Sequence, residues 1–185
     1  MNRIEKGSLL VLAIIVAFNI FFGLGSIPLL DPDEPVYAET AREMIQFNDY
    51  LSPRIYNEYW FDKPPMYYWL VAGAMHVFGD GEFAARFPAA LMAFLTVIML
   101  YCSITKLFNE RAGFWSALVL ATSVQFFYLG KAAVTDTTLL FFLPGTKNMQ
   151  KYYRAWKNDP DRAFCYRGQR HTHIHQPILL MQVAQ

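Results

Sequence analysis

Near its start, the chain carries a charge-free run of 22 residues, LLVLAIIVAFNIFFGLGSIPLL (9–30), which is followed at once by DPDEP (31–35). A helix needs about 20 consecutive apolar residues to cross a bilayer, so this run predicts a membrane span. Asp31, Asp33 and Glu34 then stand where the helix leaves the membrane, and ionisable groups beside hydrocarbon are costly. These carboxylates mark a candidate functional site, although helix capping and interfacial solvation would also explain Asp33 and Glu34.

The composition indicates a membrane protein rather than an ordinary soluble domain. Of the 185 residues, 55% are hydrophobic and 17% aromatic, whereas soluble domains contain about 45 to 50% apolar residues even with glycine included. Sixteen basic and fifteen acidic residues leave a formal charge of +1, which provides no strong field for binding nucleic acid. The two cysteines lack the spacing of a metal or redox pair.

Two further charge-free runs, Phe87–Thr105 and Ala112–Gly130, contain 19 residues each and predict additional spans. Another run begins at Thr137 but stops after nine residues. The sequence therefore predicts an all-α fold of polytopic membrane helices, with three full spans, an aborted fourth and an external loop that carries amphipathic interfacial helices. The predicted spans are 9–30, 87–105 and 112–130, and the external loop is 31–86. A cleaved signal peptide is the alternative for the first run, but its apolar core would be unusually long.

The small basic excess from Arg3 and Lys6 places the N-terminus in the cytoplasm by the positive-inside rule. The segment 64–79 is apolar but short and rich in tyrosine and tryptophan, which favours an interfacial or re-entrant helix over a crossing one. If it does not cross, Asp136 reaches the same side of the membrane as Asp33. The expected location is the inner membrane of the cell.

Within the external loop, Asp33 is well placed to cap a second helix, and the pattern from Val36 to Phe47 predicts an amphipathic helix on the membrane surface. Residues 52–58 are expected to form an extended, turn-rich connection. Glu82–Arg86 is expected to be a short amphipathic lead-in to the second span. The brief connection at 109–111 predicts an antiparallel helix pair.

From residue 144 to 185 the chain is polar, with no run of spanning length, and is expected to be disordered or frame-shifted. Alternating His171, His173 and His175 in this tail form only a weak metal-binding pattern, so no metal site is expected there.

Five short motifs occur in an order and spacing that resembles polytopic, lipid-dependent glycosyltransferases of the GT-C type. They are DEPVYAE (33–39), AREM (41–44), FDKPPMYYW (61–69), FAARFP (83–88) and AVTD (133–136). The chain is most similar to the branch that holds the bacterial aminoarabinose lipid A transferases and is related to the protein O-mannosyltransferases. The likeness covers about residues 8–143, the N-terminal third of such an enzyme.

This resemblance implies an integral membrane enzyme that transfers a sugar from a polyprenyl-phosphate carrier to a lipid or protein acceptor outside the cytoplasm. It implies that Asp33 and Glu34 are catalytic, that Lys63 holds the carrier phosphate and that Asp136 faces the same cavity. Asp62 stands where close relatives often have glutamate, and its shorter arm leaves a metal or hydrogen-bonding role open. No cofactor follows with certainty, and a divalent cation stays an open alternative.

The chemistry agrees with these roles. Breaking a glycosyl phosphate bond builds positive charge on the sugar carbon and negative charge on the leaving phosphate. A carboxylate such as Asp33 can accept a proton, and an ammonium such as Lys63 can stabilise the phosphate. Arg42 could assist the phosphate, but pairing with Glu39 on its own helix is an equal alternative.

Because members of that family have many more spans, we expect the chain to be a truncated form or a fragment. A non-catalytic membrane remnant that binds polyprenyl phosphate or a partner is the main alternative to a transferase. A small transporter is less favoured, because the polar residues lie in loops rather than in broken helices.

Overall fold

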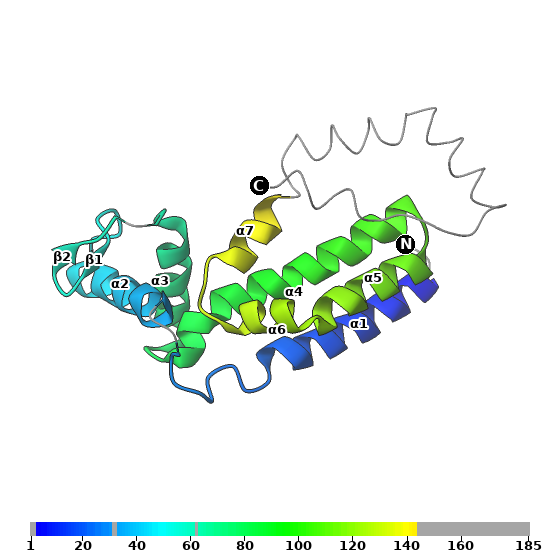
Figure 1. The fold of residues 1–185 in the computed structure, drawn as a ribbon, viewed down its shortest axis with the longest axis horizontal. Coiled ribbons are helices and arrows are strands. Elements are labelled where there is room, and N and C mark those ends of the chain that lie inside the picture. Colours follow the sequence, from blue (N-terminus) through cyan, green and yellow to red (C-terminus); the bar gives the residue numbers. More distant parts are fainter. Residues whose placement is uncertain (1–2, 31–32, 62, 144–185) are drawn as a thin grey trace, which may run out of the picture. The chain divides into compact units, whose positions relative to one another are not determined.

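The structure, a computed structural model, describes residues 3–30, 33–61 and 63–143. This part of the chain is mostly helical (Figure 1). Its elements are α1 (Arg3–Phe21), α2 (Asp33–Phe47), β1 (Arg54–Ile55), β2 (Glu58–Tyr59), α3 (Met66–Phe78), α4 (Glu82–Leu107), α5 (Glu110–Thr122), α6 (Val124–Lys131) and α7 (Asp136–Phe142). The predicted tail 144–185 and its histidines lie outside the described residues.

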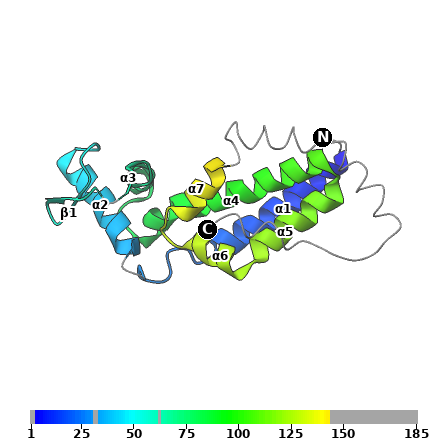
Figure 2. The ribbon, with the colours of Figure 1, turned by 45° about the horizontal axis from the view of Figure 1, so that its top comes forward.

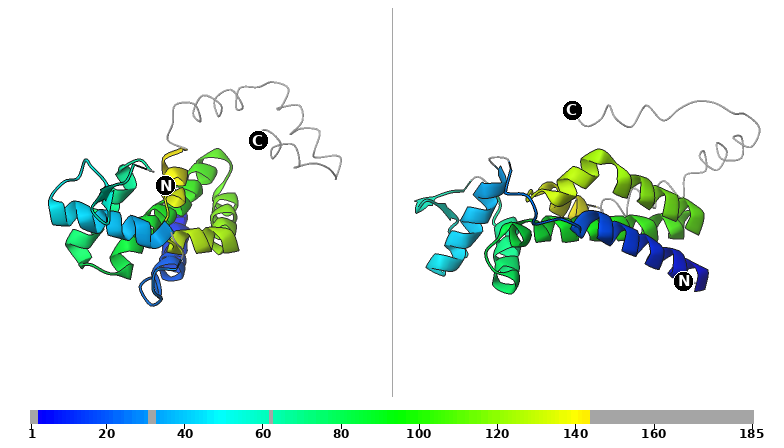
Figure 3. Two further views of the ribbon diagram at one scale, coloured as in Figure 1. Left: turned by 60° about the vertical axis from the view of Figure 1, so that its left-hand side comes forward. Right: turned by 90° about the horizontal axis from the view of Figure 1, so that it is seen from below.

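The longest helix, α4, has 26 residues and is therefore about 39 Å long. It contacts each of the other six helices in the described part of the chain. Its first turns pack with α2 and α3 in one hydrophobic cluster, and its later turns pack with α1, α5 and α6 in a second cluster. Figures 2 and 3 show α2 and α3 at one end of α4, with α1 and α5 along the remainder. α4 is thus the element that both clusters share.

The two helices that were predicted between the first and second spans are present, and the connection between them is a β-hairpin. α2 covers the predicted surface helix, and α3 forms within the predicted interfacial segment. The strands β1 and β2 pair antiparallel through a two-residue turn in which Tyr56 and Asn57 have φ values of 53° and 67°. Such positive values are typical of the type I′ turn. This hairpin lies in the connection that was expected to be extended and turn-rich, and the described part of the chain is otherwise mainly helical.

The expected lead-in Glu82–Arg86 forms the first turns of α4, which runs without interruption from Glu82 and includes Pro88. In the described residues, α4 is the one helix that is long and apolar enough to cross a membrane by itself. The apolar part of α1, Gly7–Phe21, is shorter than a span. Turns close at Leu24 and Ser26, with Gly23 at a φ of 70°, so this helix does not continue to residue 30 as predicted.

The predicted third span is broken at Ser123, where α5 and α6 meet at an angle of 65°. These two helices satisfy the length and hydropathy of a span only when they are taken together. The hydroxyl of Thr122 donates to the carbonyl of Leu118 at 2.8 Å, and the hydroxyl of Ser123 donates to that of Leu120 at 3.0 Å. Such bonds from serine and threonine back to the helix often accompany bends.

The predicted antiparallel pair of α4 and α5 is confirmed. Asn109 begins α5, and its side-chain oxygen accepts a hydrogen bond from the Ala112 N–H at 2.8 Å. Gly113 lies against α4 so closely that an added Cβ would be 3.0 Å from the Tyr101 carbonyl oxygen and 3.1 Å from the Thr105 nitrogen. Only a residue without a side chain fits this contact without displacing the backbone.

We expect Gly113→Ala to lower the stability of the α4–α5 pair by about 1 to 3 kcal/mol, because the new methyl group would overpack a backbone contact. Gly73→Ala is the matched control, since an added Cβ at Gly73 in α3 meets nothing within 4 Å. Alanine should stabilise that helix by about 0.5 to 1 kcal/mol. Thermal unfolding in detergent measures both variants, and equal shifts would contradict the assigned contact.

Candidate active site at the start of α2

The start of α2 is held by a buried ion pair between Glu34 and Arg86. The Nη2 of Arg86 lies 2.8 Å from Oε2 of Glu34, and its Nε lies 3.1 Å from Oε1. The two side chains are only 4% and 7% exposed. Paired, charge-assisted hydrogen bonds of this kind are the strong class of ion pair.

Every hydrogen-bonding direction of this pair is used. Arg86 Nη1 donates to the carbonyls of Leu24 and Ile27 at 3.2 and 2.7 Å, and Nη2 also donates to that of Pro28 at 3.0 Å. With the two bonds to Glu34, these match the five N–H donors of a guanidinium. The Glu34 carboxylate accepts two further bonds from backbone N–H groups.

The same carboxylate joins two more segments. The backbone N–H of Leu30 donates to Oε2 of Glu34 at 2.9 Å, and that of Ala133 donates to Oε1 at 2.6 Å. Ala133 lies in the connection between α6 and α7. The ion pair therefore fixes the loop after α1, the start of α2, the first turns of α4 and the segment before α7 to one another.

The pKa of Glu34 lies below its ordinary value. Burial raises this pKa, but the hydrogen bond from Arg86, the N–H groups of Ala133 and Leu30 and the charge of Arg86 together outweigh it. An ionised carboxylate with all its acceptor directions occupied is a poor general base. The geometry thus favours a positioning role for Glu34, whereas its sequence motif implied a catalytic one.

Asp33 is the first residue of α2 and is exposed. Successive residues of a helix point about 100° apart, so the inward position of Glu34 turns Asp33 outward. Asp136, the exposed first residue of α7, follows Ala133 by three positions. The structure therefore brings the segments that carry Asp33 and Asp136 together at Glu34.

The other predicted residues lie at different places. Lys63 is exposed and stands shortly before α3. Arg42 forms the alternative pair with Glu39, with its Nη2 2.6 Å from Oε1. Asp62 lies outside the described residues, so its role remains a prediction. No group of three or more His, Cys, Asp or Glu side chains within the described ranges could hold a metal ion.

The aromatic residues after Lys63 pack inward more than their sequence suggests. Tyr67 and Tyr68 are 2% and 0% exposed and contact Tyr37 of α2. Trp69 is partly exposed, and its indole N–H donates to the Tyr50 carbonyl at 2.6 Å. The two tyrosines therefore join α3 to α2 as part of the hydrophobic core.

Arg86 is the site residue whose role the sequence did not disclose. In the sequence, this arginine is only a member of the FAARFP motif and of a short lead-in to an apolar run. A lone charge at the head of an apolar helix could have indicated it, because such a charge needs a partner. The partner Glu34 is 52 residues earlier in the chain, and the contribution of the Ala133 N–H has no sequence signal.

The mainly helical fold, a helix long and apolar enough to cross a membrane and the buried acid–arginine pair beside an exposed aspartate fit the class of lipid-dependent glycosyltransferases that the sequence resembles. Residues 62–165 match the family described as dolichyl-phosphate-mannose-protein mannosyltransferase, and the chain belongs to this family. The predicted resemblance is confirmed at this level. The match runs past residue 143, where the likeness was expected to end.

Several curated relatives are arabinosyl transferases. The chain is 32% identical to undecaprenyl phosphate-alpha-4-amino-4-deoxy-L-arabinose arabinosyl transferase of Yersinia enterocolitica, covering 82% of this chain and 27% of the relative. It is 30% identical to the enzyme of that name from Pseudomonas savastanoi, covering 89% of this chain and 28% of the relative. The chain thus spans about a quarter of the length of these relatives.

Solved structures of ArnT from Cupriavidus metallidurans are also similar. The form bound to undecaprenyl phosphate superposes with a TM-score of 0.68 at 28% identity and covers 72% of this chain and 25% of that chain. The apo form superposes with a TM-score of 0.67 over the same shares of both chains. The fold of the matched part of this chain is therefore similar to that of the corresponding quarter of ArnT.

Replacing Glu34 by glutamine should destabilise the protein by about 3 to 5 kcal/mol, because the Arg86 charge would remain buried without a partner. Glu39→Gln is the matched control, since it removes the exposed pair with Arg42 and should change the stability little. Chemical denaturation in detergent gives both free energies of unfolding. Equal values for the two variants would show that the buried pair does not hold the fold.

The pH dependence of stability should follow from the lowered pKa of Glu34. Its ionised form stabilises the fold above the ordinary value of 4.5, and this contribution is lost as the pH falls through the folded-state pKa. The wild-type protein should therefore lose stability more steeply below that value than Glu34→Gln does. Unfolding midpoints from about pH 7 to about pH 3 test this, and parallel curves would contradict it.

Proposed function

We propose that this chain forms the part of a glycosyltransferase that binds a polyprenyl-phosphate sugar and presents a catalytic carboxylate, Asp33, to the reacting centre. The observation that carries the proposal is the buried pair of Glu34 and Arg86, which directs Asp33 outward beside the segment that leads to Asp136. The relatives named for transfer from undecaprenyl phosphate support the class of donor.

The proposed reaction is a displacement at the sugar carbon. An acceptor hydroxyl attacks this carbon, the bond to the carrier phosphate breaks, and the bonding electrons leave with the phosphate. Asp33 accepts the hydroxyl proton, which is general base catalysis. The ammonium of Lys63 stabilises the departing phosphate, and Asp136 orients the sugar or the acceptor. Family resemblance favours inversion at the sugar carbon.

We further propose that the protein is a multi-pass protein of the inner membrane with a cytoplasmic N-terminus and the loop 31–86 outside. α4 has the length and hydropathy of a span, and α5 with α6 supplies a second, bent one. The first helix exposes large apolar side chains, with Leu10, Ile14 and Phe18 each more than 60% exposed. Contact with lipid explains such a surface on α1.

The acceptor is proposed to be a lipid, because the sequence motifs resemble those of the aminoarabinose lipid A transferases most closely, whereas the family description favours a protein. A membrane protein that binds the carrier without turnover is the second candidate function. It would use Lys63 in the same way but would not need Asp33. The two candidates therefore differ in the effect of a change at Asp33.

Lys63→Ala should weaken binding of undecaprenyl phosphate by roughly 10- to 100-fold, because one charged hydrogen bond contributes about 1.5 to 3 kcal/mol. Asp33→Asn should leave this binding within about twofold. Binding to the purified 185-residue protein is measured by fluorescence or native mass spectrometry. Lys106→Ala, an exposed lysine near the far end of α4, is the matched control and should bind as the wild type does.

For turnover, residues 3–143 are exchanged into the matching segment of the Cupriavidus metallidurans enzyme. In an active chimera, Asp33→Asn should lower the rate of transfer of radiolabelled sugar by about 10²- to 10⁴-fold, because general base catalysis typically contributes a rate factor of this size. Transfer that survives Asp33→Asn would refute the catalytic role of this residue. Unchanged binding in Lys63→Ala would refute the role of Lys63.

A further inference from the structure

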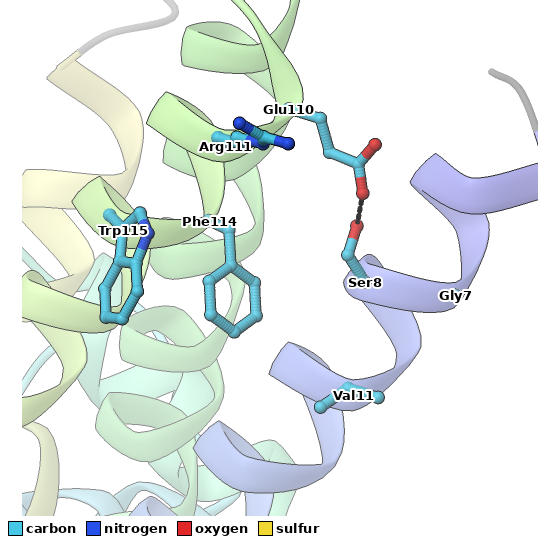
Figure 4. Close-up of a pocket in the computed structure, with 7 residues that line it drawn as sticks. All are labelled: Gly7, Ser8, Val11, Glu110, Arg111, Phe114 and Trp115. Atoms are coloured by element: carbon cyan, nitrogen blue, oxygen red, sulfur yellow. Dashed lines mark hydrogen bonds between the residues drawn. The ribbon is translucent and has the colours of Figure 1, made fainter.

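A pocket of about 340 Å³ opens between α1 and α5, at the far end of α4 from Arg86 (Figure 4). Arg86 lies near the start of α4, whereas the pocket adjoins Glu110, just after its last residue Leu107. At 1.5 Å per residue, these two ends of α4 are about 32 Å apart, close to the thickness of a bilayer core. The pocket is therefore separate from the proposed active site, and its volume lies in the range of small-molecule sites.

The polarity of the pocket changes in the same direction along both helices. On α1, Ser8 is followed one turn later by Val11. On α5, Glu110 and Arg111 are followed one turn later by Phe114 and Trp115. Figure 4 shows the charged groups toward one end of the pocket and the two aromatic rings with the valine toward the other. This gradient fits an amphiphile whose polar end lies at the helix starts.

The charged end of the pocket carries one acid and one base. The Ser8 hydroxyl donates to Oε1 of Glu110 at 2.5 Å and also pairs with the Tyr101 hydroxyl at 2.8 Å. These bonds fix the carboxylate at the boundary between α1 and α5. Arg111 is exposed and adds a guanidinium, which binds phosphate well, at the start of a helix, where the dipole also favours an anion.

We propose that this pocket binds a glycerophospholipid whose headgroup carries both a phosphate and a primary ammonium. The phosphate lies at Arg111, and the ammonium donates hydrogen bonds to Glu110. The part of the acyl chains next to the headgroup lies over Phe114, Trp115 and Val11. Charge complementarity selects this occupant. A headgroup with phosphate alone would face the Glu110 carboxylate without compensation, and a quaternary ammonium has no N–H to donate to it.

Such a lipid would connect α1 with α5 at the end of α4 that is remote from Asp33. In the membrane arrangement proposed above, this end lies at the cytoplasmic leaflet, whereas the sugar carrier is used on the other side. The site is therefore a structural lipid site and not a second donor site. Its lining residues do not overlap with Glu34, Arg86 or Lys63.

The test is native mass spectrometry of the purified 185-residue protein, with phosphatidylethanolamine, phosphatidylcholine and phosphatidylglycerol of identical acyl chains added in equal amounts. We expect phosphatidylethanolamine to be retained several-fold more than either other lipid. Glu110→Gln and Arg111→Gln should each lower its retention about tenfold. The glutamine at position 110 keeps an oxygen that can accept from Ser8, so the helix contact is preserved.

Glu82→Gln and Lys106→Gln are the matched controls, because both side chains are exposed charges on α4 that do not line the pocket. They should retain phosphatidylethanolamine as the wild type does. Equal retention of phosphatidylcholine, a preference for phosphatidylglycerol, or an unchanged lipid preference in both pocket variants would each overturn the proposal. If thermal unfolding shows Glu110→Gln to be unfolded, the retention of phosphatidylethanolamine by the Arg111→Gln variant, whose changed side chain is exposed, tests the proposal by itself.

Discussion

The buried ion pair of Arg86 and Glu34 determines how the segments around the candidate site are arranged. Taking two charges out of water costs several kcal/mol per ion, and only good geometry with further hydrogen bonds offsets this cost. Here seven hydrogen bonds involve the pair, two between its members and five to backbone groups. Because each backbone partner lies in a loop or at a helix start, the pair supplies order where regular structure does not.

The helix α4 carries Arg86 in its first turns and holds it in place by packing against the other helices. The same helix joins the two hydrophobic clusters, one on its first turns and one on its later turns. Its packing surface is rich in alanine, with Ala85, Ala89, Ala90 and Ala93 fully buried. Small side chains let helices approach closely, which is how helices associate where lipid offers no hydrophobic gain. Glycine does the same on the partner helices, since an added Cβ on Gly130 would lie 3.1 Å from the Cβ of Ala93.

The sequence predicted local features well, because each depends on neighbouring residues. The helix that ends at Phe47 and the short connection before α5 both followed from periodicity and spacing. The family also followed from sequence, because five motifs kept their order. The helix ends were less predictable, since hydropathy counts apolar residues and does not register the turn at Gly23 or the bend at Ser123.

Long-range partners could not be predicted, because nothing local distinguishes an arginine that ends a surface segment from one that enters a core. Arg86 required Glu34, 52 residues away, and the carbonyls of a loop that hydropathy had assigned to a helix. The same limit explains why Asp33 and Glu34 looked equivalent in sequence. Their difference depends on which side of α2 faces Arg86.

The contrast between these two adjacent carboxylates is the clearest functional consequence of the fold. Two neighbouring acids on one helix turn cannot both point into the same contact, so committing Glu34 to Arg86 leaves Asp33 on the open side. An acid that is buried and fully bonded resists protonation and movement, which makes it suited to hold a position. An exposed acid at a helix start can meet a substrate. The buried charge pair therefore orients the exposed carboxylate, and the order of the two residues in the DE motif decides which of them is exposed.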